Sequence, residues 1–302
     1  MAFFDDFGKK LARMSTFFRI FAKNQSELSR MAKKVLFINQ EISPYVPSSE
    51  MSEMGCLLPQ KIQEAGYEIR TFMPKWGNIN ERRGQLHEVQ RLSGMNLIIN
   101  DTDHPIVIKV ASIPNTRVQV YFIDNDEFFL KRQMTENEKG EEYTDNDNGE
   151  RAVFFARGVL ETVKKLRWAP DIIHCQGWMS AVIPLYIKTA YQDEPSFANT
   201  KVVTSLFQSQ LKGDLGDHFK SALAYREVTA ELLKPYKKKF DFLELGKLAI
   251  DYSDAIVEAG KKVNKPLLNY VADKELPMLK YPGEDFGEAY LNFYDTICPD
   301  GE

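Results

Sequence analysis

Residues that could hold a polar ligand follow three short apolar runs of this 302-residue chain. Glu41 and Tyr45 come after the first run, His174 closes the second, and Thr204 closes the third. Carboxylate, phenol and imidazole side chains can all hydrogen-bond a ligand such as a sugar. In open α/β sheets, ligands bind where the carboxyl ends of parallel strands meet loops and helix N-termini. We therefore expect the binding site at these three strand ends.

Short apolar runs alternate with amphipathic stretches from Lys33 onward, which predicts strands connected by helices. The first unit has a strand at 35–38, a helix at 51–64 and a strand at 68–73. A strand–helix–strand unit of about forty residues indicates a parallel sheet. Further strands are expected at 171–174, 201–204 and 254–257, and further helices at 149–166, 178–191, 240–252 and 284–294.

Residues 86–122 break this alternation. Three β-like runs at 97–99, 106–110 and 118–123 are separated by Asn, Asp and Pro, which predicts a small antiparallel insertion on the main sheet. Residues 131–150 are polar and acidic, so we expect an exposed, mobile loop there. The predicted fold class is α/β, with a Rossmann-like parallel sheet flanked by helices.

Two segments, 34–77 and 148–188, carry a family resemblance. The first contains Gln40-Glu-Ile-Ser-Pro-Tyr-Val46, and the second contains Trp168-Ala-Pro-Asp-Ile-Ile-His-Cys-Gln-Gly-Trp178. Both resemble the N-terminal half of bacterial glycogen synthases and plant starch synthases, which are family 5 glycosyltransferases. The resemblance implies one half of a two-domain GT-B enzyme of glycogen biosynthesis, which transfers glucose from ADP-glucose to an α-1,4-glucan.

Several family-matched positions lie at the first strand end, where the family carries Glu-x-x-Pro-Tyr/Phe-x-Lys-x-Gly-Gly-Leu-x-Asp. Glu41, Pro44 and Tyr45 match this pattern, and Glu53 stands at the aspartate position. The resemblance implies that Glu41, Tyr45 and Glu53 bind substrate.

Three positions of the same motif differ from the family. Pro47 replaces the lysine, and Ser49 and Glu50 replace the glycine pair that lets backbone amides approach the diphosphate of the donor. Proline supplies neither a cation nor an amide donor. Glu50 adds a negative charge where a phosphate would lie. We therefore predict that this loop disfavours a sugar-nucleotide diphosphate.

The second strand end also differs from the family, which carries His-x-His-Asp-Trp-His there. His174 and Trp178 match, whereas Gln176, Gly177 and Met179 replace the second His, the Asp and the last His. His174 fits two roles equally well, a hydrogen-bonded strand-end residue or a substrate contact. Trp178 is interpreted as helix packing rather than as a platform for glucan stacking.

The composition excludes several classes of protein. Hydrophobic residues make up 43% and charged residues 27%, which is ordinary for a globular protein, and the net charge of −4 does not favour nucleic-acid binding. No stretch approaches the roughly 20 apolar residues of a membrane span, so a cytoplasmic protein is expected. The three cysteines are far apart and are expected to be buried thiols. The four histidines lack ligand spacing, so neither a metal site nor a cofactor is predicted.

Residues 1–30 form a separate extension before a domain at 31–302. Their apolar residues recur at steps of three and four among Lys and Arg, which predicts an amphipathic helix. This helix could bind a membrane surface or a partner. Alternatively, it is an extension translated from an upstream start, because Met31 looks like a natural beginning.

The resemblance covers the first of the family's two domains. No second glycine-rich strand–helix series follows Val271, so we expect a chain that is inactive on its own, a pseudoenzyme unless a partner protein supplies the other half. The alternative is a non-catalytic module that binds an α-glucan, a nucleotide sugar or a partner synthase.

Overall fold

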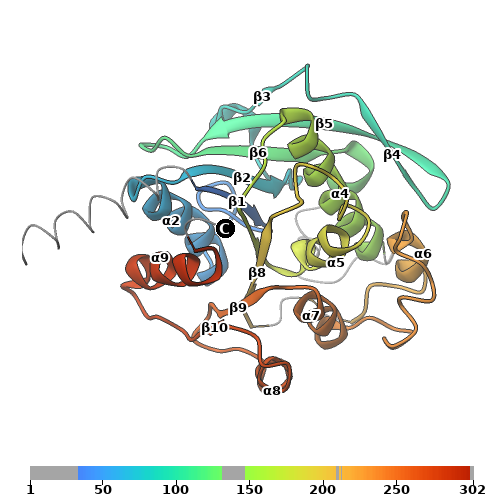
Figure 1. Cartoon of the computed structure of the whole chain (residues 1–302). Helices are drawn as coiled ribbons and strands as arrows, with labels where there is room; N and C mark the ends of the chain where they lie inside the picture. The colour runs from blue at the N-terminus through green and yellow to red at the C-terminus, as the bar shows by residue number, and fades with distance from the viewer. Residues whose placement is uncertain (1–32, 131–146, 209–210, 212, 300–302) are drawn as a thin grey trace, which may run out of the picture.

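The computed structural model describes residues 33–130, 147–208, 211 and 213–299. Within these residues a ten-stranded, mostly parallel sheet lies between two layers of helices (Figure 1). The strand order is β10-β9-β8-β7-β1-β2-β6-β5-β3, and β4 pairs with β5. The α/β class with a small antiparallel part, which the sequence predicts, is confirmed.

The elements have the following bounds. The strands are β1 Lys34–Asn39, β2 Glu68–Pro74, β3 His87–Glu88, β4 Met95–Ile99, β5 Thr102–Ser112, β6 Gln119–Asp124, β7 Ile172–Gln176, β8 Lys201–Leu206, β9 Ala255–Glu258 and β10 Met278–Leu279. The helices are α2 Glu50–Glu64, α3 Glu81–Gly84, η1 Asp126–Leu130, α4 Asn148–Leu166, η2 Trp178–Ser180, α5 Ile183–Lys188, α6 Phe219–Leu223, α7 Phe242–Asp251, α8 Lys265–Asp273 and α9 Phe286–Ile297.

The central strands are buried on both faces, which explains their continuous apolar runs. In β1, Val35 and Phe37 belong to the core beneath α2 and α9, whereas Leu36 and Ile38 belong to the larger core on the other face. Strand β1 pairs in parallel with both β2 and β7, so its carboxyl end lies at the centre of the sheet. This position puts the segment after β1 beside the ends of its neighbours.

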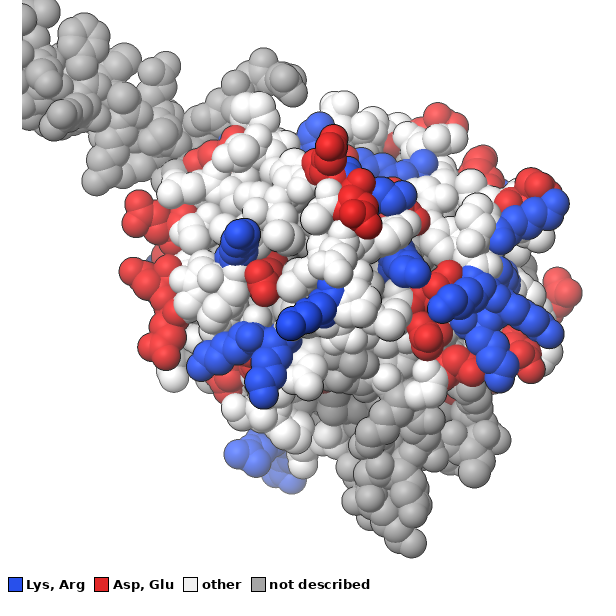
Figure 2. Space-filling view, turned by 90° about the horizontal axis from the view of Figure 1, so that it is seen from below, with Lys and Arg blue, Asp and Glu red and all other residues white. Residues whose placement is uncertain are grey.

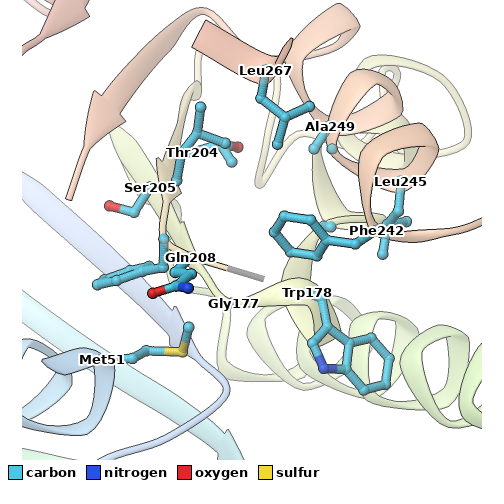
Figure 3. A pocket seen from close by; sticks show the side chains of 14 residues that line it. Met51, Gly177, Trp178, Thr204, Ser205, Gln208, Phe242, Leu245, Ala249 and Leu267 are labelled. Atoms are coloured by element: carbon cyan, nitrogen blue, oxygen red, sulfur yellow. The ribbon is translucent and has the colours of Figure 1, made fainter. Parts of the chain in front are cut away.

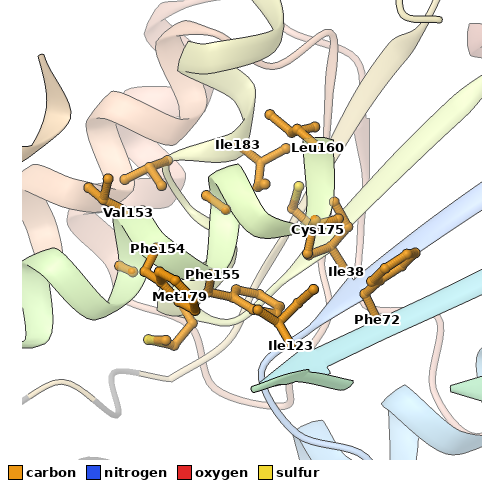
Figure 4. Packing of buried hydrophobic residues seen from close by; sticks show 14 of the residues in the cluster. Ile38, Phe72, Ile123, Val153, Phe154, Phe155, Leu160, Cys175, Met179 and Ile183 are labelled. Atoms are coloured by element: carbon orange, nitrogen blue, oxygen red, sulfur yellow. The ribbon is translucent and has the colours of Figure 1, made fainter. Parts of the chain in front are cut away.

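Helices cover the two faces unequally. Figure 1 shows α2 and α9 on one face of the sheet and α4, α5 and α7 on the other. Phe154 and Phe155 of the long helix α4 are fully buried and pack towards Ile38, Phe72 and Ile123 of the sheet (Figure 4). Helix α9 lies against α2 on the opposite face and closes the smaller core.

The sequence predicts that the run at 118–123 belongs to an antiparallel insertion, and this prediction is wrong in part. Strand β6 pairs in parallel with β2 and antiparallel with β5, so it is the strand at which the sheet changes direction. A local apolar pattern fixes a strand but not its partner. Only β3, β4 and β5 make the antiparallel part among the described residues.

The single helix predicted at 178–191 is two short helices. Residues 178–180 form the 3₁₀ helix η2, and α5 begins at Ile183 with Pro184 in its first turn. Proline has no N–H to donate, and its ring clashes with the carbonyl four residues earlier. Pro184 therefore ends the first helical turn and starts a new helix.

Two sequence predictions fall on residues outside the described ranges: the amphipathic extension at 1–30, and all but the end of the polar loop at 131–150. Among the described residues, no helix is both long and apolar enough to cross a membrane. The sequence predicts that all three thiols are buried. Cys175 is buried, whereas Cys56 and Cys298 are only half-buried. The face in Figure 2 mixes positive and negative side chains rather than presenting one sign.

Candidate functional site

The segment that follows β1 is held tightly to the start of helix α2. The Glu41 carboxylate accepts hydrogen bonds from Ser49 Oγ at 2.7 Å and from Gln40 Nε2 at 3.1 Å. Ser49 also caps α2 by accepting the backbone N–H of Ser52 at 3.0 Å. Burial is the main cause of the raised pKa of Glu41, and the two hydrogen bonds oppose it. This carboxylate fixes the loop and is almost completely covered, with 4% exposure.

A glycine makes this close packing of loop and helix possible. A Cβ at Gly55 would lie 2.4 Å from the Glu41 carbonyl oxygen, a distance that backbone atoms cannot accommodate. The Ser43 N–H donates to the Ser52 carbonyl at 2.9 Å across the same contact. The first turn of α2 is therefore directed at a fixed position on the carboxyl edge of the sheet.

The Glu50 carboxylate points from this first turn to the loop after β9. Its Oε1 accepts the backbone N–H of Lys261 at 3.0 Å. A Cβ at Gly260 would lie 2.9 Å from Oε2, so the carboxylate rests against the glycine backbone. Glu53, one turn along, accepts a hydrogen bond from Ser48 Oγ at 2.8 Å. The Glu50 carboxylate thus already accepts a backbone amide of the loop after β9.

An open groove of about 600 Å³ lies beside Glu50. Its charged lining residues are Glu50, Glu53, Lys261, Lys262 and Glu284. Three carboxylates and two ammonium groups leave the groove without a cationic excess. Lys261 and Lys262 are not among the residues predicted from the sequence, although they follow the end of β9, where a ligand would be expected by the same reasoning as for the other strands.

Neither Pro47, at the lysine position of the family motif, nor Lys75 supplies a free positive charge beside Glu50. Pro47 is exposed and uses its carbonyl to accept a hydrogen bond from Ser52 Oγ at 3.1 Å. Lys75 is buried and paired with Glu81 at 3.0 Å, in the segment after β2. The first turn of α2 itself carries two carboxylates, Glu50 and Glu53, and the nearby lysines of the groove are Lys261 and Lys262.

Tyr45 packs against the edge part of the sheet, at β5 and β6. Its hydroxyl donates to the Ser112 carbonyl at 2.9 Å, and its ring packs edge-on against Phe122 with centroids 4.9 Å apart. Burial raises the pKa of this phenol to about 12. Tyr45 also lines a second cavity, which shares no lining residue with the groove at Glu50.

His174 lies inside the protein beneath α9. Its Nδ1 is hydrogen-bonded to the Tyr294 hydroxyl, and its Nε2 lies 2.7 Å from Ser205 Oγ. Complete burial lowers the pKa of the imidazole to about 3, so it is neutral at physiological pH. Both nitrogens are used internally, and the side chain has no exposed surface. The geometry favours the first of the two roles, a strand-end residue that attaches β7 to α9.

The other positions of the second motif are also buried. Gln176 and Met179 have no exposed surface, and Trp178 is 2% exposed within the larger core. Gly177 has φ +87°, and a Cβ there would lie 2.6 Å from the Gln40 Cβ. Gly177 is therefore required by the packing of this turn against the segment after β1.

A small apolar cavity of about 40 Å³ lies at the ends of β7 and β8. Figure 3 shows Phe242 and Leu245 of α7 on one side and Met51 of α2 on the other. Its two strand hydroxyls are already used, since Thr204 is bonded to Ser253 and Ser205 to His174. The cavity is about the size of a water molecule and too small for a sugar.

Known proteins share both the sequence and the fold. Residues 34–271 match the family model described as the starch synthase catalytic domain. The glycogen synthase of Chlorobium luteolum is 36% identical over 208 residues, which are 68% of this chain and 42% of that protein. The glycogen synthase of Chlorobaculum tepidum is 31% identical over 275 residues, which are 89% of this chain and 54% of that protein.

The fold is also similar to that of a solved structure. It is the catalytic domain of starch synthase IV from Arabidopsis thaliana bound to ADP and acarbose, with a TM-score of 0.64 and 17% identity. The similarity covers 82% of this chain and 51% of that chain. The chain therefore spans about half the length of these relatives.

Proposed function

The chain belongs to the starch synthase catalytic domain family, and from this premise we propose that it forms one wall of a glucosyltransferase site. The reaction would be glucosyl transfer from ADP-glucose to an α-1,4-glucan. We further propose that these 302 residues do not catalyse the transfer by themselves.

The observation that carries this proposal is the position of the Glu50 carboxylate. It lies at the first turn of α2 and accepts the Lys261 N–H at 3.0 Å, so it occupies a donor that a phosphate oxygen would need. Glu53 adds a second negative charge in the same turn. A helix N-terminus attracts anions, but here the protein's own carboxylates already satisfy that preference.

Transfer of a glucosyl group requires more than one side of a binding cleft. The donor must be positioned, the departing diphosphate must be stabilised by preorganised positive charge, and water must be excluded. The groove at Glu50 is open and carries three carboxylates against two lysines. It offers neither the charge nor the enclosure that the leaving group needs.

Incubation of the purified chain with ADP-glucose and a maltoheptaose primer tests the proposal. We expect no elongation of the primer, while a complete glycogen synthase assayed in parallel elongates it. Sustained chain growth catalysed by the isolated protein would refute the inactivity.

A second candidate function is a non-catalytic module that binds a glucan or a partner synthase. The cavity beside Tyr45 supports glucan binding, because Asn78, Gln85 and Asn115 in its lining can hydrogen-bond hydroxyl groups and it shares no residue with the groove at Glu50. Binding of maltoheptaose without transfer would support this candidate. Co-purification with a synthase in the absence of any glucan binding would favour the partner role.

A further inference from the structure

A cavity of about 630 Å³ lies between the segment after β1, helix α3 and the turn from β5 to β6. Its volume is in the range of small-molecule sites, about 300–1,000 Å³, and is large enough for more than one sugar ring. It shares no lining residue with the groove beside Glu50.

The rim of the cavity is rich in amide side chains. Asn78, Gln85 and Asn115 are exposed, and none of them has a side-chain hydrogen-bond partner within the described ranges. The Arg83 guanidinium is likewise exposed and without an ion-pair partner in this part of the chain. Each amide offers both donors and acceptors, and the guanidinium offers donors only. This set matches a ligand whose groups donate and accept at many positions, as hydroxyl groups do.

The buried part of the cavity lining is apolar. Tyr45, Ile79 and Ile113 line it and are at most 9% exposed. Tyr45 is held by its hydrogen bond to the Ser112 carbonyl, and Asn80 Oδ1 caps α3 by accepting the Arg83 N–H at 2.9 Å. A preformed site loses little conformational entropy on binding. An apolar floor beneath a polar rim suits the C–H face and the hydroxyl edge of a sugar ring.

The charge of the lining selects among ligand classes. No carboxylate lines the cavity among the described residues, which disfavours cations. Arg83 is its one charged group there, and no lysine or helix of useful length accompanies it, which disfavours a diphosphate. A neutral ligand with many hydroxyl groups fits best.

We propose that this cavity binds a neutral oligosaccharide, with Asn78 and Arg83 contacting its hydroxyl groups. The choice of an α-1,4-glucan as the test ligand rests on the proposed function. The site itself is argued from the cavity, and its test requires no catalysis.

The test is an isothermal titration of the full chain with maltoheptaose, alongside titrations with inorganic phosphate and pyrophosphate. We expect maltoheptaose to bind with a dissociation constant on the order of 1 mM. Asn78→Ala and Arg83→Ala should each weaken binding roughly fivefold through one lost hydrogen bond. Asn96→Ala is the matched control, because this exposed amide on β4 lines none of the three cavities. It should leave binding unchanged.

Three results would overturn the inference: no binding of maltoheptaose up to roughly ten times the expected constant, equal binding by the wild-type chain and both cavity variants, or binding of phosphate in place of the oligosaccharide. Circular dichroism of each variant excludes unfolding as the cause of a loss. Primer elongation would contradict the proposed inactivity, whereas a lack of oligosaccharide binding at this cavity would contradict this inference. The two measurements are separate, so the two failures are distinguishable.

Discussion

Replacing Tyr294 by phenylalanine should weaken the attachment of α9 to the sheet while its ring packing is kept. Tyr294 is fully buried, and its hydroxyl is bonded to Nδ1 of the equally buried His174. The variant removes one hydrogen bond and leaves a buried imidazole nitrogen without its partner. Leaving a buried polar group unsatisfied costs about 1–3 kcal/mol. We therefore expect the free energy of unfolding to fall by about 2 kcal/mol.

Urea unfolding followed by circular dichroism measures this loss. Tyr281→Phe serves as the control, because the hydroxyl of this partly exposed tyrosine makes no hydrogen bond within the described ranges. Removing that hydroxyl should change the free energy of unfolding by less than about 0.5 kcal/mol. If Tyr294→Phe were as stable as the wild type, His174 would not depend on this bond. The imidazole of His174 would then have no structural role in holding α9 to the sheet.

The remaining predictions concern pH and one glycine. Burial lowers the pKa of His174 to about 3, so between about pH 6.5 and pH 3 the unfolded chain binds a proton that the folded chain does not. The free energy of unfolding should therefore fall as the pH decreases, by about 2 kcal/mol from pH 7 to pH 5. His174→Gln should remove that contribution. If urea unfolding at pH 7 and pH 5 showed the same loss of stability in the variant as in the wild type, the prediction would be contradicted. Gly177→Ala should destabilise the fold by about 2–4 kcal/mol, because it combines positive φ with a contact of 2.6 Å. Gly94→Ala has positive φ but no atom within 4 Å, so thermal unfolding should show a loss of only about 1 kcal/mol, and equal losses would refute the steric explanation.

The main strands could be predicted from the sequence because continuous apolar runs mark strands that are covered on both faces. Val35–Ile38 lies within β1, and 201–204 lies within β8. The partner of a strand could not be predicted in the same way, because β6 looks like any other alternating run and yet joins β2 in parallel. The break at Pro184 follows from proline chemistry, although the apolar spacing around it continues as a helix would.

The candidate site depends on contacts between distant segments. Glu50 and Lys261 are 211 positions apart, and His174 and Tyr294 are 120 positions apart. A residue's type indicates that it can bind an anion or a sugar, but not whether another part of the chain already occupies it. The internal partners of Glu50 and His174 therefore became visible only in the folded structure.

A calorimetric titration of the full chain with ADP-glucose tests the central claim most directly. The negative first turn of α2 predicts no binding heat at concentrations up to about 1 mM, for the wild-type protein. Binding at one site per chain with a dissociation constant in the range of about 1–100 μM, weakened by a substitution in the groove such as Lys262→Ala, would contradict the account.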